Sequence, residues 1–130
     1  MESRWEHRQQ MVAIGLRIYQ RGYVAATDGN ISLSIDEERL LVTPAGVCLG
    51  ELRPEELVVV ELGGAMSGQS QRPTSELPMH LEVYGQRPDV RAVIHAHPPL
   101  ATAFTVAGIS LAQCVIPEVP DPRFIAERLD

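Results

Sequence analysis

Two histidines, His95 and His97, are separated by one residue and follow an apolar run, Ala92-Val93-Ile94. Side chains alternate between the faces of a β-strand, so both imidazoles would project to one side, with backbone positions roughly 6 to 7 Å apart. Imidazoles placed in this way can bind one metal ion. On a helix they would lie about 200° apart, so the strand and metal-ligand interpretations support each other. A bare His-x-His pair also occurs at ordinary strand ends, and both interpretations stay open.

A carboxylate precedes the histidines at a predicted helix start. Glu76 follows Pro73-Thr74-Ser75, where Ser75 suits the N-cap and Glu76 the first helical turn. Backbone N–H groups and the helix dipole at such a terminus attract phosphate, although simple capping explains the same residues. His80 lies one turn after Glu76 on the same face, as a ligand, an orienting group or a packed histidine, and we favour packing.

Two loops place small polar residues and glycine beside predicted strand ends. Thr27-Asp28-Gly29-Asn30 leads into a strand, and Thr43-Pro44-Ala45-Gly46 leaves one. Ligands often bind at such positions because glycine lets the backbone come close to them. Each loop is equally consistent with an ordinary turn. The combination with Thr74, Ser75 and the histidine pair is what favours a binding site.

The predicted elements alternate between helices and strands. Helical spacing of apolar residues predicts helices over 4–22 and 99–107, and one from the N-cap at Ser75 to Gln86. Alternating or β-branched runs predict a hairpin over 30–35 and 39–43, and strands over 57–62, 91–95 and 113–116. This mixture predicts an α/β or α+β sheet covered by helices.

The composition limits the function. A chain of 130 residues and 14.3 kDa, with 45% hydrophobic and 22% charged residues, is typical of one globular domain. The net charge of -6 and pI near 5.2 disfavour nucleic acid and anionic membranes as partners. All eleven basic residues are arginines, so no lysine can form a Schiff base with a substrate carbonyl. A metal ion is the natural substitute for carbonyl chemistry.

The cellular compartment is predicted from the cysteines and the N-terminal residues. Cys48 and Cys114 show no Cys-x-x-Cys spacing, and the charged N-terminus does not resemble a secretory signal, so a reduced cytoplasm is expected. Residues 98–117 carry no formal charge, but their prolines, glycine and polar residues favour a buried helix and strand over a membrane span.

Four motifs occur together in a fixed order: Gly29-Asn30-Ile31-Ser32, Thr43-Pro44-Ala45-Gly46, Pro73-Thr74-Ser75-Glu76 and His95-Ala96-His97-Pro98-Pro99. In order and spacing they resemble the class II aldolase/adducin family, from the first helix to about Val119. The resemblance implies a three-layer α/β/α fold, incomplete at the C-terminal end, and one domain over 1–130.

The resemblance also implies a function, namely a zinc-dependent lyase that cleaves a phosphorylated ketose by retro-aldol chemistry, as L-fuculose-phosphate aldolase does. It implies that His95 and His97 are zinc ligands and that Glu76 is the catalytic acid/base. Zinc would polarise the carbonyl and hold the enediolate while Glu76 moves the proton. The implied phosphate-binding residues are Thr27, Asn30, Gly46, Thr74 and Ser75.

Other members of the family leave alternatives. Related epimerases have aspartate at the position of Glu76, which favours an aldolase, but dehydratases and decarboxylases keep similar motifs. The adducin branch gives a further alternative, a non-catalytic oligomeric module. Family members form tetramers with sites at subunit interfaces, so a homo-oligomer is expected.

The chain departs from the family after Val119. Longer relatives have a third zinc-binding histidine and a catalytic tyrosine downstream, but here no histidine follows His97 and no tyrosine follows Tyr84. Residues 120–130 do not resemble the family's continuation. A truncated or frame-shifted member is therefore expected, in which Glu76, water or a neighbouring subunit would complete the zinc site.

Overall fold

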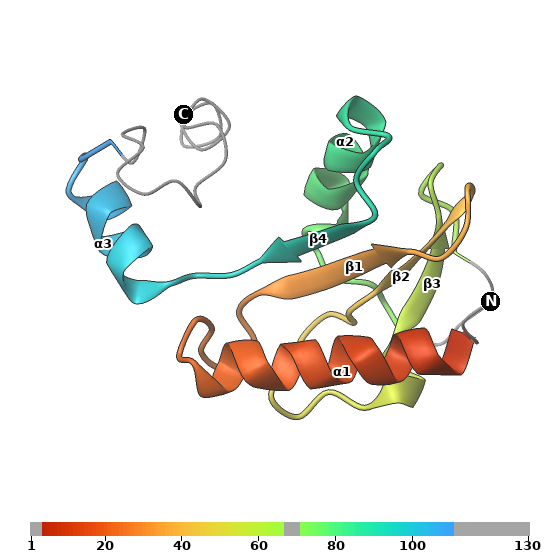
Figure 1. Ribbon diagram of the computed structural model, residues 1–130, viewed down its shortest axis with the longest axis horizontal. Helices are drawn as coiled ribbons and strands as arrows, with labels where there is room; N and C mark the ends of the chain where they lie inside the picture. The colour runs from red at the N-terminus through yellow and green to blue at the C-terminus, as the bar shows by residue number, and fades with distance from the viewer. Residues whose placement is uncertain (1–3, 67–70, 111–130) are drawn as a thin grey trace. The chain divides into compact units, whose positions relative to one another are not determined.

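The computed structural model describes residues 4–66 and 71–110, whose elements are traced in Figure 1. Backbone contacts divide the chain into two compact units, residues 1–96 and residues 97–130. The expectation of one domain over 1–130 stays a prediction. The first unit contains α1 (Arg4–Gln20), β1 (Asn30–Ser34), β2 (Arg39–Val42), η1 (Pro54–Glu56), β3 (Val58–Glu61), α2 (Leu77–Gln86) and β4 (Ala92–His95).

The four strands form one antiparallel sheet in the order β3-β2-β1-β4. β1 and β2 form the predicted hairpin. Asp36 shapes its turn, because Oδ1 accepts hydrogen bonds from the backbone N–H groups of Glu38 at 3.0 Å and Arg39 at 2.8 Å. β4 pairs with the other side of β1 and places His95 opposite Asn30. Two distant motifs therefore meet at one end of these strands.

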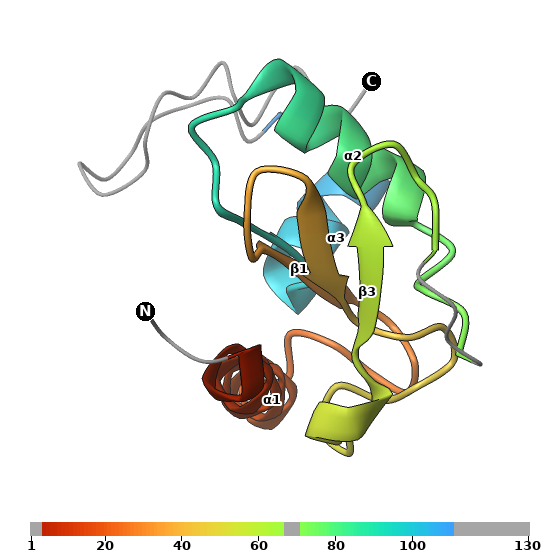
Figure 2. The same cartoon turned by 90° about the vertical axis from the view of Figure 1, so that its right-hand side faces the viewer.

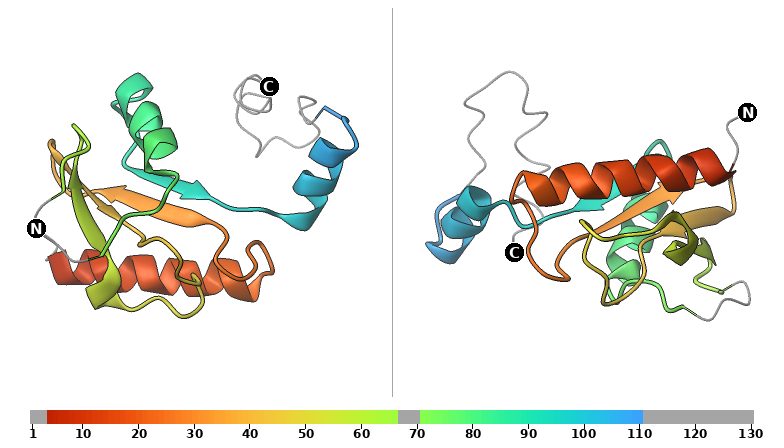
Figure 3. Two further views of the ribbon diagram at one scale, coloured as in Figure 1. Left: turned by 180° about the vertical axis from the view of Figure 1, so that it is seen from behind. Right: turned by 90° about the horizontal axis from the view of Figure 1, so that it is seen from below.

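α1 covers one face of the sheet and lies across it in the view from below (Figure 3). Arg8 attaches the helix to the segment around η1, because its Nη1 donates to the carbonyl oxygens of Pro54 at 2.7 Å and Leu57 at 2.8 Å. Burial of the shared apolar surface stabilises this layer by about 25 cal/mol per Å². Its buried side chains are Met11, Val24, Ile31, Leu41, Leu49, Leu52, Leu57 and Val59.

α1 ends at Gln20, inside the predicted range 4–22, and Gly22 stops it as expected. Gly22 has a φ of +71°, which glycine adopts readily. The N–H of Gly22 donates to the carbonyl of Tyr19 and the N–H of Tyr23 to that of Ile18, at 2.9 and 3.1 Å. This pair of bonds is the Schellman arrangement, which terminates helices at a glycine.

α2 covers the opposite face of the sheet, so that Figure 2 shows α1 and α2 on either side of the strands. Neighbouring residues of one strand serve different layers: Leu41 packs on the α1 side and Leu40 on the α2 side. This three-layer α/β/α arrangement confirms the predicted fold class. The buried side chains of the α2 side are Leu40, Val42, Val58, Val60, Leu77 and Tyr84.

The start of α2 corrects one prediction. Glu76, not Ser75, occupies the N-cap position, and Ser75 is exposed. The turn before the helix is formed instead by Thr74, whose carbonyl accepts from the N–H of Leu77 at 3.1 Å and whose Oγ1 accepts from the N–H of Glu76 at 3.3 Å. The N–H of Leu77, which a capping Ser75 hydroxyl would have bound, is thus satisfied by the carbonyl of Thr74.

The described part of the second unit, residues 97–110, contains α3 (Pro99–Val106), close to its predicted range. Gly108, with a φ of +68°, ends it with the same pair of backbone bonds that terminates α1. The strand predicted over 113–116 lies outside the described residues. Within 4–66 and 71–110, no helix combines the length and apolar character needed to cross a membrane.

Candidate active site

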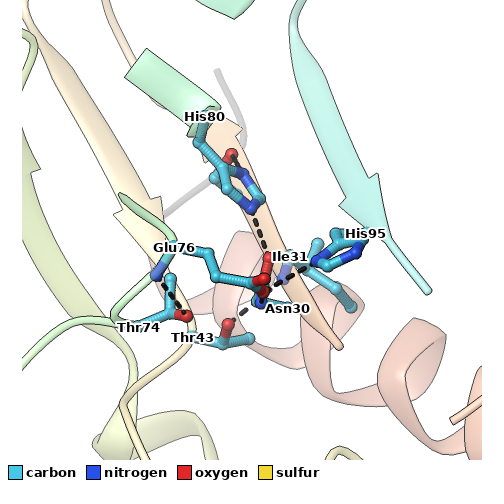
Figure 4. A network of polar contacts seen from close by, with 8 residues as sticks. Asn30, Ile31, Thr43, Thr74, Glu76, His80 and His95 are labelled. Carbon is cyan, nitrogen blue, oxygen red and sulfur yellow. Dashed lines mark hydrogen bonds and ion pairs between the residues drawn. The ribbon is translucent and has the colours of Figure 1, made fainter. Parts of the chain in front are cut away.

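The site is built around Glu76 and His95. His95 ends β4 and Glu76 occupies the N-cap position of α2, and Nδ1 of His95 lies 2.7 Å from Oε2 of Glu76. The side chains are 42% exposed for Glu76 and 25% exposed for His95, so both can be reached from solvent. A carboxylate accepts only, so Nδ1 carries the proton in this pair. Figure 4 shows the two side chains pointing toward each other.

Asn30 holds the same carboxylate from the other side. Its Nδ2 donates to Oε2 of Glu76, which therefore receives hydrogen bonds from both Asn30 and His95. Asn30 is only 4% exposed. Its position at the start of β1 opposite His95 explains why both donors reach one oxygen. A carboxylate held by two fixed donors is oriented before any substrate arrives.

His80 lies behind Asn30 and is fully buried. Its Nε2 is 2.5 Å from Oδ1 of Asn30, and its Nδ1 is 2.7 Å from Oγ of Ser32. The pKa of His80 is lowered from 6.5 to about 4, mainly by burial and also by the charge of His95, while Glu76 partly opposes the shift. The ring is therefore neutral at pH 7. The predicted packing of His80 is right about its burial, but its ring makes specific polar contacts.

Sequence reasoning did not find Ser32 and Tyr84, whose side-chain oxygens are 2.9 Å apart. Ser32 is fully buried beneath α2 and Tyr84 is 7% exposed. The available signal was the repetition of polar residues at alternate positions of β1, which places Asn30 and Ser32 on one face. That face would ordinarily be assigned to solvent, so the signal was ambiguous.

The predicted phosphate-binding residues lie on three segments. The loop that contains Gly46 runs beside residues 72–74, because Thr74 N–H donates to the carbonyl of Thr43 at 3.0 Å and Ala45 N–H to that of Arg72 at 2.9 Å. Gly46 and Ser75 are exposed, whereas Thr74 is buried. The structure thus brings the loop and the start of α2 together.

The remaining two predicted phosphate-binding residues precede or begin β1. Thr27 is exposed in the turn before the strand. The side-chain amide of Asn30 is engaged with His80 and Glu76. A phosphate role for these residues stays a prediction.

The structure does not test the predicted zinc ligands, His95 and His97. Across 4–66 and 71–110, no three His, Cys, Asp or Glu side chains are grouped so as to hold a metal ion. His97 belongs to the second unit, so its pairing with His95 stays a prediction. His95 itself fits a metal ligand. Its Nδ1–H points at a carboxylate, which is how metal-binding histidines are commonly oriented, and Nε2 then carries the lone pair.

The chain is similar in sequence to known proteins. Residues 9–123 match the profile of the Class II Aldolase and Adducin N-terminal domain. The chain belongs to this family. It is 37% identical over 122 residues to 3-oxo-tetronate 4-phosphate decarboxylase of Pectobacterium atrosepticum, covering 92% of the chain and 55% of the relative. It is 41% identical over 98 residues to L-fuculose phosphate aldolase of Methanococcus vannielii, covering 75% and 52%.

A solved structure shares the same fold. YgbL from Klebsiella pneumoniae matches with a TM-score of 0.76 and 36% identity, over 81% of this chain and 50% of that one. The chain therefore spans about half the length of the family members that it matches. These members include both a decarboxylase and an aldolase, so family membership by itself does not identify the reaction.

Proposed function

We propose that this chain provides half of the catalytic machinery of a metal-dependent lyase, which breaks a carbon–carbon bond near a carbonyl of a phosphorylated sugar or sugar acid. The observation that carries the proposal is the Glu76 carboxylate, held on Oε2 by Asn30 and His95 at the meeting of α2, β1 and β4. A carboxylate oriented in this way and partly open to solvent suits general acid/base catalysis.

Two reactions fit this arrangement, aldol cleavage and decarboxylation. In both, the electron pair of the broken bond is left on the carbon next to a carbonyl, and that carbon then takes a proton. In aldol cleavage, Glu76 would accept the proton of the substrate hydroxyl and return it to the carbon. In decarboxylation, carbon dioxide leaves and Glu76 would supply a proton drawn from solvent. The similarity to the Pectobacterium decarboxylase supports decarboxylation at least as well as aldol cleavage.

His95 is the proposed zinc ligand on β4, with His97 as a second ligand. Zinc, when bound, supplies a Lewis acid that polarises the substrate carbonyl. Glu76 would keep the His95 ring in the tautomer with its lone pair on Nε2. Thr74, Ser75 and the loop at Gly46 are the proposed phosphate-binding segments, because backbone N–H groups at the start of a helix attract the anion. Assembly into a homo-oligomer belongs to the same proposal.

The test of this function is Glu76→Gln, with Glu82→Gln as the matched control. Both residues belong to the same helical region, but Glu82 is exposed and accepts a hydrogen bond from the side chain of Gln86, away from the site. Each variant is made in the 130-residue chain and in a fusion with the C-terminal half of the Pectobacterium relative. The assays measure aldehyde release from L-fuculose 1-phosphate and carbon dioxide release from 3-oxo-tetronate 4-phosphate, with zinc present.

We expect Glu76→Gln to lower turnover by about 10² to 10⁴-fold, since the amide keeps the shape but cannot carry the proton. Glu82→Gln should retain the activity. The product identifies the reaction as aldol cleavage or decarboxylation. Full activity in Glu76→Gln would refute the acid/base assignment. Zinc binding without turnover by either form would favour the non-catalytic, adducin-like alternative.

A further inference from the structure

A continuous chain of hydrogen bonds runs between helix α2 and strand β1 and ends at Glu76. The Tyr84 hydroxyl contacts Ser32 Oγ at 2.9 Å, Ser32 Oγ contacts His80 Nδ1 at 2.7 Å, and His80 Nε2 contacts Asn30 Oδ1 at 2.5 Å. Asn30 Nδ2 then donates to Glu76. The first four side chains are 7%, 0%, 0% and 4% exposed, in the same order. Figure 4 shows the section from His80 to Glu76.

The donors and acceptors available in these side chains allow only one direction of donation along the series of hydrogen bonds. The carboxylate of Glu76 accepts, so Asn30 must turn its nitrogen toward Glu76 and its oxygen toward His80. That oxygen needs a donor, so the proton of His80 lies on Nε2. Nδ1 is then an acceptor and takes the hydrogen of Ser32, whose oxygen in turn accepts from Tyr84. Every hydrogen points toward Glu76.

The neutral state of His80 is needed for this order. A charged imidazolium would donate from both nitrogens, and Ser32 would then have to accept from His80 and redirect its own hydrogen. Burial disfavours the charged ring and holds the pKa of His80 at about 4. The charged groups that act on the ring are Glu76 and His95, and the titratable hydroxyl of Tyr84 contacts Ser32, the hydrogen-bond partner of the ring. Burial also raises the pKa of Tyr84, so its hydroxyl keeps its hydrogen at pH 7.

We propose that His80, Ser32 and Tyr84 are positioning residues, which fix the side-chain amide of Asn30 so that its nitrogen holds the Glu76 carboxylate in place. The inference rests on the proposed function in that Glu76 is taken as the acid/base. None of the three residues is assigned a contact with the reacting atoms. They act through Asn30, whose side-chain amide has two orientations that differ by a half-turn. One orientation presents the NH₂ donor to Glu76, and the other presents the carbonyl oxygen, which a carboxylate repels.

Apolar packing alone does not explain why these polar side chains are buried in a hydrogen-bonded series. A buried polar group costs free energy unless it is fully hydrogen-bonded, and apolar side chains of similar size would fill this layer at least as well. Leu40, Val42 and Val60 do so on the same side of the sheet. A set of buried polar groups whose bonds all point toward one partly exposed carboxylate has a direction that packing does not require.

The experiment is nitrogen-15 NMR on the metal-free 130-residue chain, which needs no catalytic turnover. Histidine spectra report which ring nitrogen carries the proton, and solvent exchange of the Asn30 amide reports how firmly it is held. In the unmodified chain we expect His80 protonated on Nε2 and His95 protonated on Nδ1 at pH 7. His80→Leu removes the donor to Asn30, and His80→Gln restores a donor close to the place of Nε2.

In His80→Leu we expect the Asn30 amide to exchange about tenfold faster, the scale of one lost hydrogen bond. His95 should lose its preference for the Nδ1 proton, because Glu76 is no longer held. His80→Gln should return both signals toward those of the unmodified chain. A role in packing alone would change the stability in His80→Leu without moving the tautomer of His95.

A second pair of variants keeps the test decisive if His80→Leu does not fold. Ser32→Ala removes the donor to His80 Nδ1. Ser34→Ala is its control on the same strand and face, because the Ser34 hydroxyl donates to the carbonyl of nearby Asp36 at 3.0 Å. Ser32→Ala should speed solvent exchange of the Asn30 side-chain amide, and both tautomers of His80 should then be populated. Ser34→Ala should change neither signal.

Two results would overturn the proposal. One is a His80 ring that carries its proton on Nδ1 or is charged at pH 7 in the unmodified chain. The other is a folded His80→Leu or Ser32→Ala variant in which the Asn30 and His95 signals stay unchanged. Failure of the proposed function has a different signature, namely full turnover in Glu76→Gln, so the two failures can be distinguished.

Discussion

The two faces of the sheet differ in what they bury. The face beneath α1 is lined by aliphatic and thioether side chains, whereas the face beneath α2 combines an apolar cluster with the buried polar residues Asn30, Ser32 and His80. β1 contributes to both, because Ile31 lies on the first face between Asn30 and Ser32 on the second. One strand therefore serves stability on one side and orientation of the site on the other.

The two faces should therefore differ in the substitutions that they tolerate. Apolar packing is non-directional, so the α1 side tolerates changes that keep its volume. A hydrogen-bonded network is directional, and each member must be paired. We therefore expect substitutions on the α1 side to lower stability in proportion to the volume removed. Substitutions of the buried polar residues on the α2 side should in addition alter protonation or orientation at the site.

The largest effect is expected on the apolar face, from Leu41→Ala. Leu41 is 2% exposed, so its truncation leaves a cavity and should lower the free energy of unfolding by about 2 to 5 kcal/mol. Leu62→Ala is the control, because Leu62 is 39% exposed and its truncation should cost well under that amount. Urea unfolding followed by circular dichroism measures both. Equal losses would contradict the assignment of the Leu41 contribution to its burial.

The second-largest effect is expected from lowering the pH, because the α2 side of the sheet buries the titratable ring of His80. The unfolded chain protonates His80 near pH 6.5, whereas in the folded chain the pKa of His80 is about 4. Protons therefore favour the unfolded state in this window. The stabilisation is complete above pH 6.5, falls as the pH drops, and is lost by about 4, for a total of about 3 kcal/mol.

The measurement is the free energy of unfolding at intervals from pH 7 to pH 4, with His80→Gln as the control. Glutamine does not titrate, so this part of the pH dependence should disappear in the variant. Leu41→Ala, on the other face, should lower the whole curve without changing its slope. An unchanged slope in His80→Gln would contradict the assignment of this window to His80.

Much of the fold was predictable because local patterns carry it. Alternating residues over 30–35 and 39–43 indicated the hairpin, and the β-branched run before His95 indicated a strand, which the structure confirms as β1, β2 and β4. The cap of α2 was predicted at Ser75 but lies at Glu76, because the Thr74 hydroxyl and carbonyl form the preceding turn. Local sequence alone does not decide between two adjacent hydroxyl residues.

The polar network was not predictable for a different reason. Alternation of Asn30, Ser32 and Ser34 with apolar residues is typical of a strand with one face in solvent. Only the packing of α2 over that face shows that Asn30 and Ser32 are buried and that His80 lies between them. Glu76 and His95 were singled out from their chemistry and the family resemblance, whereas their contact depends on the pairing of β4 with β1.

A smaller effect is expected at two glycines that flank the site. Gly29 and Gly46 both have positive φ, +77° and +72°, but a Cβ at Gly29 would lie 2.4 Å from Cγ1 of Val24 and 2.9 Å from the carbonyl oxygen of His95. At Gly46 a Cβ would meet no atom within 4 Å. We expect Gly46→Ala to cost about 1 kcal/mol from backbone strain alone, and Gly29→Ala about 2 kcal/mol or more.

Thermal unfolding of both variants measures this difference, and the His95 ring signals in NMR show whether β4 has moved. Gly29→Ala should disturb His95 because the added methyl presses on its carbonyl, whereas Gly46→Ala should leave His95 unchanged. A larger loss in Gly46→Ala than in Gly29→Ala would contradict the close approach of the loop before β1 to the end of β4.

The smallest effect is expected from Tyr84→Phe, which removes only the hydroxyl at the far end of the network. The ring stays in the apolar cluster of the α2 side, so the free energy of unfolding should fall by only about 1 kcal/mol, the usual worth of one hydrogen bond. Ser32 can still donate to His80 in this variant, so the direction of the hydrogen bonds and the neutral state of His80 should survive. The loss of the bond that orients Ser32 should only slightly speed solvent exchange of the Asn30 side-chain amide. Chemical denaturation together with the histidine NMR signals at pH 7 tests both parts. A loss as large as that of Leu41→Ala, or a change in the tautomer of His80, would mean that the hydroxyl of Tyr84 and not the buried ring of His80 sets the order of the network.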